Sequence, residues 1–164
     1  MRSIILIAHD IRSIHNVGSL LRTAEGLGVD KIYLTGYTPY PNAPNDTRLP
    51  HIAKKINDTM HKTSLGAELT ATWEHVADVH SVLQTLQQDG YRICALEQTD
   101  EAVALHNFIP PSKCALLLGS EVTGIADELL SLSPIHIVIP MFGQKESFNV
   151  VQAAAMALYH LRFS

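Results

Sequence analysis

Cys114-Ala115-Leu116-Leu117-Leu118 is an unbroken apolar run, and Gly119-Ser120-Glu121 follows it directly. A strand without polar alternation belongs in a sheet that helices cover on both faces. Glycine and small polar residues after such a strand are typical of the ligand crevice at the carboxyl ends of an open α/β sheet, although a plain turn into a helix uses the same residues. The stretch therefore predicts a fold class and a place for a binding site.

The rest of the chain repeats this pattern of buried strand and helix. Strand-like apolar runs occupy residues 4–8, 31–35, 91–96 and 135–139. Helical spacing of apolar residues predicts helices over residues 14–27, 51–62, 76–86, 125–130 and 150–161. The last of these is rich in alanine and apolar nearly all round, which is typical of a helix buried on most sides. The alternation predicts an α/β domain of three layers with a mainly parallel sheet.

Composition is that of a globular protein. The chain has 164 residues, of which 46% are hydrophobic and 17% charged, and this predicts one domain over residues 1–164 with a core of its own. No apolar run approaches the ~20 residues that a membrane span needs, and the N-terminus lacks the apolar segment of a signal peptide. Cys94 and Cys114 lie in apolar runs, which predicts buried free thiols in a reducing compartment. We therefore expect a cytoplasmic protein.

Charge is distributed unevenly along the chain. Residues 1–62 carry eight Lys or Arg and five Asp or Glu, a net charge of +3, whereas residues 63–164 carry four and eleven, a net charge of −7. A protein that grips nucleic acid by its phosphates is usually basic overall, so any such contact must come from the first part or be shared between subunits. The low charged fraction is typical of an oligomer and equally of a core rich in small residues.

Several common signatures are absent. There is no G-x-x-x-x-G-K-[ST], and Gly26-Leu27-Gly28 ends a predicted helix instead of opening one, so neither a P-loop hydrolase nor a nicotinamide-dependent enzyme is expected. The nine histidines and two cysteines show no ligand spacing, so no metal site is predicted. The G-x-S-x-G elbow of serine hydrolases is also missing.

The residues with chemical potential lie in three segments. Asn16 and Arg22 flank the start of the first predicted helix, where free backbone N–H groups favour anions. The second segment is residues 118–124, and the third is residues 139–149, between the last strand and the last helix. Plain structural roles are open at this point, because Asn16 and the polar residues that end the third segment could cap helices, and Arg22 could be a solvated helix residue.

Taken together, the three segments resemble the motifs of one family. N-x-x-x-x-x-R-T-A at residues 16–24, L-G-S-E-x-x-G at residues 118–124 and I-P-M-x-G-x-x-x-S-x-N-V at residues 139–150 are similar to motifs 1, 2 and 3 of the SpoU/TrmH branch of the SPOUT RNA methyltransferases. Ser64-Leu65-Gly66-Ala67 is similar to a small-residue segment that the family carries between motifs 1 and 2. The resemblance runs from residue 4 to residue 161, and motif 3 is the most specific of the three.

The resemblance implies a C-terminal trefoil knot, with the last predicted helix tucked through it. It also implies S-adenosylmethionine as the methyl donor, bound in a bent form within the knot loops. The residues implied to line the donor site, largely through backbone groups and apolar contact, are Leu96, Gly119, Ile139, Met141 and Phe148. Phe148 replaces the more usual leucine and keeps the wall apolar.

The activity that the resemblance implies is methyl transfer to a ribose 2′-hydroxyl of RNA, with tRNA ahead of rRNA. The catalytic residues implied are Arg22, Asn16, Glu121, Ser147 and Asn149. The donor sulfonium is already reactive, so the protein mainly has to align the hydroxyl and help to remove its proton. Because the pKa of an arginine exceeds ~12, we expect Arg22 to hold a neighbouring phosphate, although accounts of the family also make this arginine the base. Glu121 is expected to organise Arg22 and Asn16 and not to abstract the proton.

The resemblance further implies a homodimer whose active site is completed across the interface. The residues predicted to contact RNA phosphates are Arg12, Arg48, Lys54, Lys55 and Lys62, with a solvated helix face as the alternative. No appended RNA-binding domain is expected beside the single methyltransferase domain, so the enzyme either reads a small RNA element itself or needs a helper protein. Two other functions stay open, a base-methylating enzyme of the same superfamily and a knotted RNA-binding or assembly module without catalysis.

Overall fold

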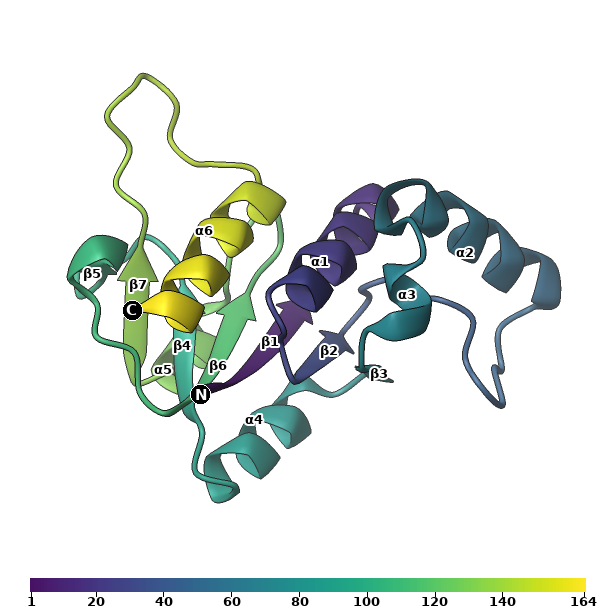
Figure 1. Ribbon diagram of the computed structural model, residues 1–164, viewed down its shortest axis with the longest axis horizontal. Helices are drawn as coiled ribbons and strands as arrows, with labels where there is room; N and C mark the ends of the chain where they lie inside the picture. Colours follow the sequence, from purple (N-terminus) through teal and green to yellow (C-terminus); the bar gives the residue numbers. More distant parts are fainter.

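Seven parallel strands form one sheet in the order β3-β2-β1-β6-β4-β7-β5 in the computed structural model, which describes residues 1–164 (Figure 1). The strands are β1 (Ser3–His9), β2 (Lys31–Thr35), β3 (Trp73–Val76), β4 (Arg92–Leu96), β5 (Val103–Ala104), β6 (Lys113–Leu118) and β7 (Ile135–Val138). The helices are α1 (Ile14–Gly26), α2 (Pro50–Ser64), α3 (Ala67–Thr70), α4 (Val79–Gln88), α5 (Asp127–Ser131), α6 (Val150–Phe163) and the short 3-10 helix η1 (Leu105–Asn107). The predicted α/β class with a parallel sheet is confirmed.

Helices cover both faces of the central strands because side chains alternate between the two faces along each strand. Leu6 and Leu116 pair across β1 and β6 and pack in one cluster with α1 and α6. Their neighbours Ile7 and Leu117 also pair, and they pack in a second cluster with α4 and α5. This burial on both faces explains why the central strands show no polar alternation. No helix is both long and apolar enough to cross a membrane.

The region between α2 and α4 differs from the prediction. Val76 was expected to begin a helix, but it is the last residue of β3, and α4 begins at Val79 after the capping side chain of Asp78. Strand β3 is a short edge strand held by parallel pairing with β2, and its polar residues Glu74 and His75 hide the strand pattern. The helix predicted from Val76 therefore begins three residues too early.

The small-residue segment Ser64-Leu65-Gly66-Ala67 forms the turn between α2 and α3. Leu65 and Gly66 both have left-handed backbone conformations there. The buried Glu68 fastens the turn, because its carboxylate accepts hydrogen bonds from the Ser64 hydroxyl and from the Gly66 N–H at 3.0 Å. In this structure the segment has a local structural role.

Helix α6 packs against α1 and β6 and brings the two ends of the chain together (Figure 1). Arg162 near its end donates to the carbonyls of Leu27 at 3.0 Å and Arg2 at 2.9 Å. The trefoil knot stays a prediction. Cys94 and Cys114 are buried and free, as predicted, with 3.2 Å between their sulfur atoms.

Candidate active site

A cavity of about 730 Å³ lies at the carboxyl ends of β4, β6 and β7. Its walls are the three segments that follow these strands together with the beginning of α6. Parallel strands carry their ligand sites at this edge of the sheet because the connecting loops splay apart there. The stretch after Leu118 that suggested a crevice from sequence alone does line this cavity.

The loop after β6 is shaped by two glycines that touch. Ser120 and Gly124 exchange backbone hydrogen bonds of 3.1 and 2.9 Å, which folds residues 119–124 into a tight turn. A Cβ on Gly119 would lie 2.5 Å from the carbonyl carbon and oxygen of Gly124, closer than real side chains approach. Gly124 itself has a φ of 68°, which L side chains rarely adopt. At its two glycines the turn has room for backbone but not for side chains.

Charged side chains around the cavity have one sign. Four carboxylates line it and no Lys, Arg or His does, and the four are Glu97, Glu121, Asp127 and Glu146. Such a lining disfavours an anionic ligand and suits a cationic one, because the field of like charges adds up in a cleft. Apolar contact comes from Leu96, Ile139 and Phe148. The cavity thus fits a ligand with a cationic part and a flat apolar part.

Glu121 is tied to the start of α1. Its carboxylate accepts hydrogen bonds from the backbone N–H groups of Arg12 at 3.1 Å and Ser13 at 3.3 Å, and from the side-chain amide of Asn16 at 3.2 Å. Partial burial raises the pKa of Glu121, but the hydrogen bonds from Arg12, Asn16 and Ser13 outweigh it, and the pKa lies below the ordinary value of 4.5. At neutral pH Glu121 is therefore an anion that holds its neighbours in place.

Asn149 links this group to the last helix. Its side-chain oxygen caps α6 by accepting from the Val151 N–H at 2.9 Å, and its amide nitrogen donates to the Asn16 oxygen at 3.5 Å. Glu121, Asn16 and Asn149 thus form one hydrogen-bonded chain across the second, first and third sequence segments. The capping role that sequence left open for Asn149 is real, and it coexists with the link to Asn16.

The other two predicted catalytic residues lie outside this chain of hydrogen bonds. Ser147 is exposed and lines the cavity. Arg22 is exposed on α1 and does not line the cavity. It borders a separate polar hollow between α1 and α2 that includes Ser19 and Thr63. Within one chain, the structure therefore brings together four of the five predicted catalytic residues and leaves Arg22 apart.

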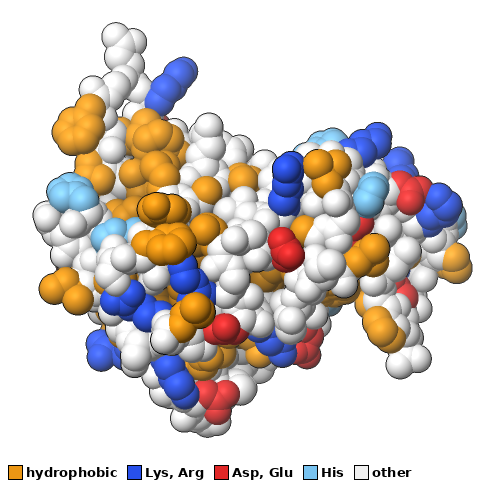
Figure 2. Space-filling model, viewed as in Figure 1, with side chains coloured by type: hydrophobic (Ala, Val, Ile, Leu, Met, Phe, Trp, Pro, Cys, Tyr) orange, Lys and Arg blue, Asp and Glu red, His pale blue; other side chains and the backbone are white.

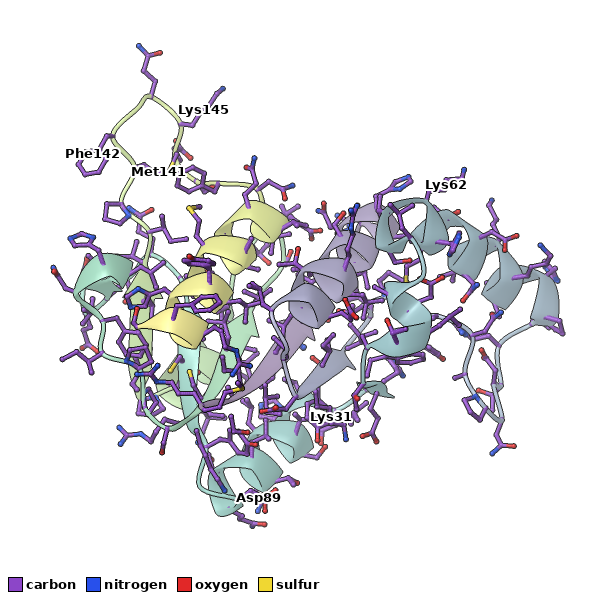
Figure 3. All side chains as sticks on the ribbon, viewed as in Figure 1. Lys31, Lys62, Asp89, Met141, Phe142 and Lys145 are labelled. Carbon is purple, nitrogen blue, oxygen red and sulfur yellow. The ribbon has the colours of Figure 1, made fainter.

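Four of the five residues predicted to contact the methyl donor line the cavity, and Met141 does not. The four are Leu96, Gly119, Ile139 and Phe148. Met141 lies at the base of a loop between β7 and α6 that projects away from the body of the protein, and Phe142 and Lys145 extend from the same loop (Figure 3). This projection is the physical reason why Met141 does not line the cavity, and its contact with the donor stays a prediction.

Sequence reasoning missed several polar residues of the cavity wall. Glu97 follows β4 directly, Thr99 lies two residues further on, and Asp127 begins α5. His136 stands behind this wall, where its ring nitrogens pair with the Thr99 hydroxyl at 2.9 Å and the Leu130 carbonyl at 3.1 Å. The position of Glu97 at the carboxyl end of a buried strand was the available signal, because Leu96 beside it was already assigned to the site.

The residues predicted to bind RNA fall into two groups. Lys54, Lys55 and Lys62 are exposed on α2, and Lys54 pairs with Asp58 one turn further on. Helix α2 extends beyond the sheet, and Lys, Arg and His side chains gather over it (Figure 2). Arg12 is exposed beside the cavity, at the loop that Glu121 holds.

Arg48 is engaged within its own loop instead of facing solvent. Its guanidinium donates to the Asp46 carboxylate at 2.5 Å and to the carbonyls of Tyr40 and Pro41 at 2.8 Å. It also stacks on Tyr40, with 3.6 Å between Arg48 Cζ and the centre of the ring. The hydrogen bond from Arg48 lowers the pKa of Asp46 strongly. The predicted phosphate contact of Arg48 is not supported, because these partners already occupy its donors.

Comparison with known proteins relates nearly the whole chain to RNA methyltransferases. The SpoU rRNA Methylase family matches residues 3–159. A tRNA (guanosine(18)-2′-O)-methyltransferase of Borreliella burgdorferi is 26% identical over 156 residues, which cover 94% of this chain and 64% of that protein. The AdoMet-bound rRNA methyltransferase from Sinorhizobium meliloti superposes with a TM-score of 0.83 at 20% identity, over 98% of this chain and 56% of that one.

A further solved structure concerns the 2-OH methylation of C/U34 on tRNA. It superposes with a TM-score of 0.79 at 22% identity and covers 98% of this chain and 94% of that chain. By contrast, the chain spans between 46% and 64% of the length of the first curated relatives that it matches. The likeness to the solved structures supports the fold.

Proposed function

The chain belongs to the SpoU rRNA Methylase family, and from this premise we propose that it transfers a methyl group from S-adenosylmethionine to a ribose 2′-hydroxyl of RNA. The observation that carries the proposal is the hydrogen-bonded chain of Glu121, Asn16 and Asn149 beside the cavity. It gathers polar groups from three distant segments at one edge of the cavity. An acceptor hydroxyl at this edge would meet amide and carboxylate groups that can orient it.

The cavity suits the methyl donor in its charge and in its apolar contacts. Bound S-adenosylmethionine supplies a methyl group activated on a cationic sulfur, and the four carboxylates that line the cavity favour that charge. Leu96, Ile139 and Phe148 offer apolar contact to an adenine ring, and the turn of Gly119 and Gly124 offers backbone groups. The residues present therefore suit the group that the family binds.

Arg22 and Ser147 complete the proposed site on the RNA side. The guanidinium of Arg22 has no partner in its own chain and presents a planar set of donors that match a phosphate. We assign it to the phosphate beside the reacting ribose, since a guanidinium stays protonated at neutral pH and cannot accept the proton of the hydroxyl. The exposed Ser147 lies at the cavity wall, where its hydroxyl can bond to the ribose.

We propose a homodimer, which the placement of Arg22 outside the cavity of its own chain supports. A second copy could bring its Arg22 to the cavity of the first, as the family resemblance implies. Exposed apolar side chains near α6 support such an interface, including Phe142 at 98% exposed and Tyr159 at 61% exposed. Figure 2 shows hydrophobic side chains gathered over α6 and the loop that precedes it. Burying such a patch favours association.

For the substrate we propose tRNA ahead of rRNA, recognised through Arg12, Lys54, Lys55 and Lys62. The Borreliella burgdorferi relative is named for a tRNA nucleotide, and the similar structure of nearly equal length concerns tRNA. The small number of free basic residues argues that two subunits pool their surfaces or that a helper protein contributes. We place the enzyme in the cytoplasm and treat residues 1–164 as one methyltransferase domain.

The test is methyl transfer with analysis of the product nucleoside. Purified protein is incubated with S-adenosylmethionine labelled in its methyl group and with tRNA or rRNA, and the RNA is digested to nucleosides. A labelled 2′-O-methylnucleoside supports the proposal, whereas a labelled base supports the base-methylating alternative. If the protein binds the donor in calorimetry but transfers no methyl group to either RNA, the proposal that the isolated protein is active is overturned. If it binds RNA but no donor, it is an RNA-binding module without catalysis.

A further inference from the structure

Glu97 joins three parts of the cavity wall. It follows β4 directly, and its backbone N–H donates to the Ile137 carbonyl of β7 at 3.0 Å. Its two carboxylate oxygens accept from two different backbone donors, the Gln98 N–H and the Ile125 N–H, each at 2.9 Å. The second of these bonds crosses from β4 to the end of the loop after β6. One side chain thus connects the segments that follow β4 and β6.

The carboxylate of Glu97 also occupies the space beside Gly124. A Cβ built on Gly124 would collide with Glu97 Oε2, the oxygen that accepts from Ile125. On the other side of the turn, Gly124 presses against Gly119. Glu97, Gly124 and Gly119 therefore form a stack without spare room, and the position of the turn depends on the carboxylate that backs it.

We propose that Glu97 is a positioning residue that holds the 119–125 turn in the shape that binds the methyl donor. The inference rests on the proposed function and deepens it, because neither the motifs nor the predicted donor contacts include Glu97. A carboxylate suits the task better than an amide, because two N–H donors require two acceptor oxygens. A glutamine would set its NH₂ group against one of these donors and lose a bond.

Binding of S-adenosylmethionine by calorimetry tests the proposal. We expect E97Q to weaken donor binding about tenfold and E97A more, since E97Q loses one of the two hydrogen bonds to the carboxylate and E97A loses both. The matched control is E101Q, since Glu101 is exposed four residues further on and does not line the cavity. RNA affinity should stay within twofold in all three variants. Unchanged donor affinity in both E97Q and E97A, or an equal loss of RNA affinity, would overturn the assignment.

A double-mutant cycle tests the contact between Glu97 and Gly124. G124A alone should weaken donor binding through both the collision with Glu97 and the left-handed backbone. In the E97A background the collision is gone, so the same substitution should cost less, and the two losses should not add. Strictly additive losses would show that the carboxylate does not shape the turn.

Hydrogen exchange separates this inference from the proposed function. The Ile125 amide should exchange faster in E97Q and E97A than in the wild type, with or without a methyl donor, because its acceptor is weakened or lost. If the wild type binds no S-adenosylmethionine, the proposed function fails, and faster exchange at Ile125 still supports Glu97 as the residue that holds the turn. Unchanged exchange would overturn that role, whatever the donor affinity. Hydrogen exchange also tests the role of Glu97 if G124A does not fold.

Discussion

Gly119 is the single residue on which the shape of the cavity depends most directly. Because even a Cβ at this position would lie 2.5 Å from the Gly124 backbone, Gly119→Val should open the turn and lower affinity for S-adenosylmethionine by more than ~100-fold. Calorimetry measures the loss. Gly26→Val is the matched control, since open space surrounds Gly26 and it lies outside the cavity. Tight donor binding by Gly119→Val would place the donor site elsewhere.

Glu121 differs from Gly119 in acting through its charge. Its pKa in the folded chain lies below the ordinary 4.5, so its stabilising contribution is complete above that value and is lost only as the pH falls through the depressed pKa. Between about pH 6 and pH 9 we therefore expect no titration of Glu121 in the rate of methyl transfer.

Glu121→Gln should lower the rate about tenfold at every pH in this range, because it weakens the hold on Asn16 and on the loop before α1. The pH dependence of the initial rate of methyl transfer, measured for wild type and variant side by side, checks this. An acidic limb in the wild type that disappears in Glu121→Gln would make Glu121 the general base and contradict the role of an organiser.

At the scale of elements, the long buried strands and amphipathic helices were predictable because their burial follows from one periodic pattern each. Strand β3 was not, since its four residues include Glu74 and His75 and its pairing with β2 is a tertiary fact. Helix α3 has only four residues and depends on the turn that Glu68 fastens. Short elements at the margin of the sheet take their conformation from neighbours that are distant in sequence.

The site shows the same division. The motifs indicated Glu121 and Asn149, but their link through Asn16 requires the first and third motifs to meet in space. Glu97 could have been suspected from its place beside Leu96, but its hydrogen bond with Ile125 could not, because the two residues lie 28 positions apart. Arg48, by contrast, binds residues two to eight positions away and so fixes its own loop, and its contact with RNA stays a prediction.

Helix α2 is the element through which we expect RNA to be held. Lys54→Glu with Lys55→Glu should weaken RNA binding and lower the slope of log affinity against log salt, since each lost phosphate contact removes roughly 0.7–0.9 from that slope. The matched control is Arg92→Glu with Lys113→Glu, which makes the same change of charge at the amino ends of β4 and β6, away from the cavity. Binding titrations at several salt concentrations measure both. Equal salt slopes for the two double variants would show that α2 is a solvated face that does not contact RNA.

At the scale of the whole molecule, the separation of Arg22 from the cavity predicts an active site shared between two copies. Arg22→Ala should abolish methyl transfer and leave donor binding intact. Gly119→Val should lose donor binding but still carry a functional Arg22. Mixed in equal amounts and allowed to exchange subunits, the two inactive variants should regain about a quarter of wild-type activity, because half of the dimers are mixed and each mixed dimer has one complete site. Native mass spectrometry, which separates the mixed dimer from the two homodimers by mass, shows whether exchange has occurred. Mixed dimers without activity would mean that Arg22 serves the cavity of its own chain, and the loop between β7 and α6 would then have to move to admit it.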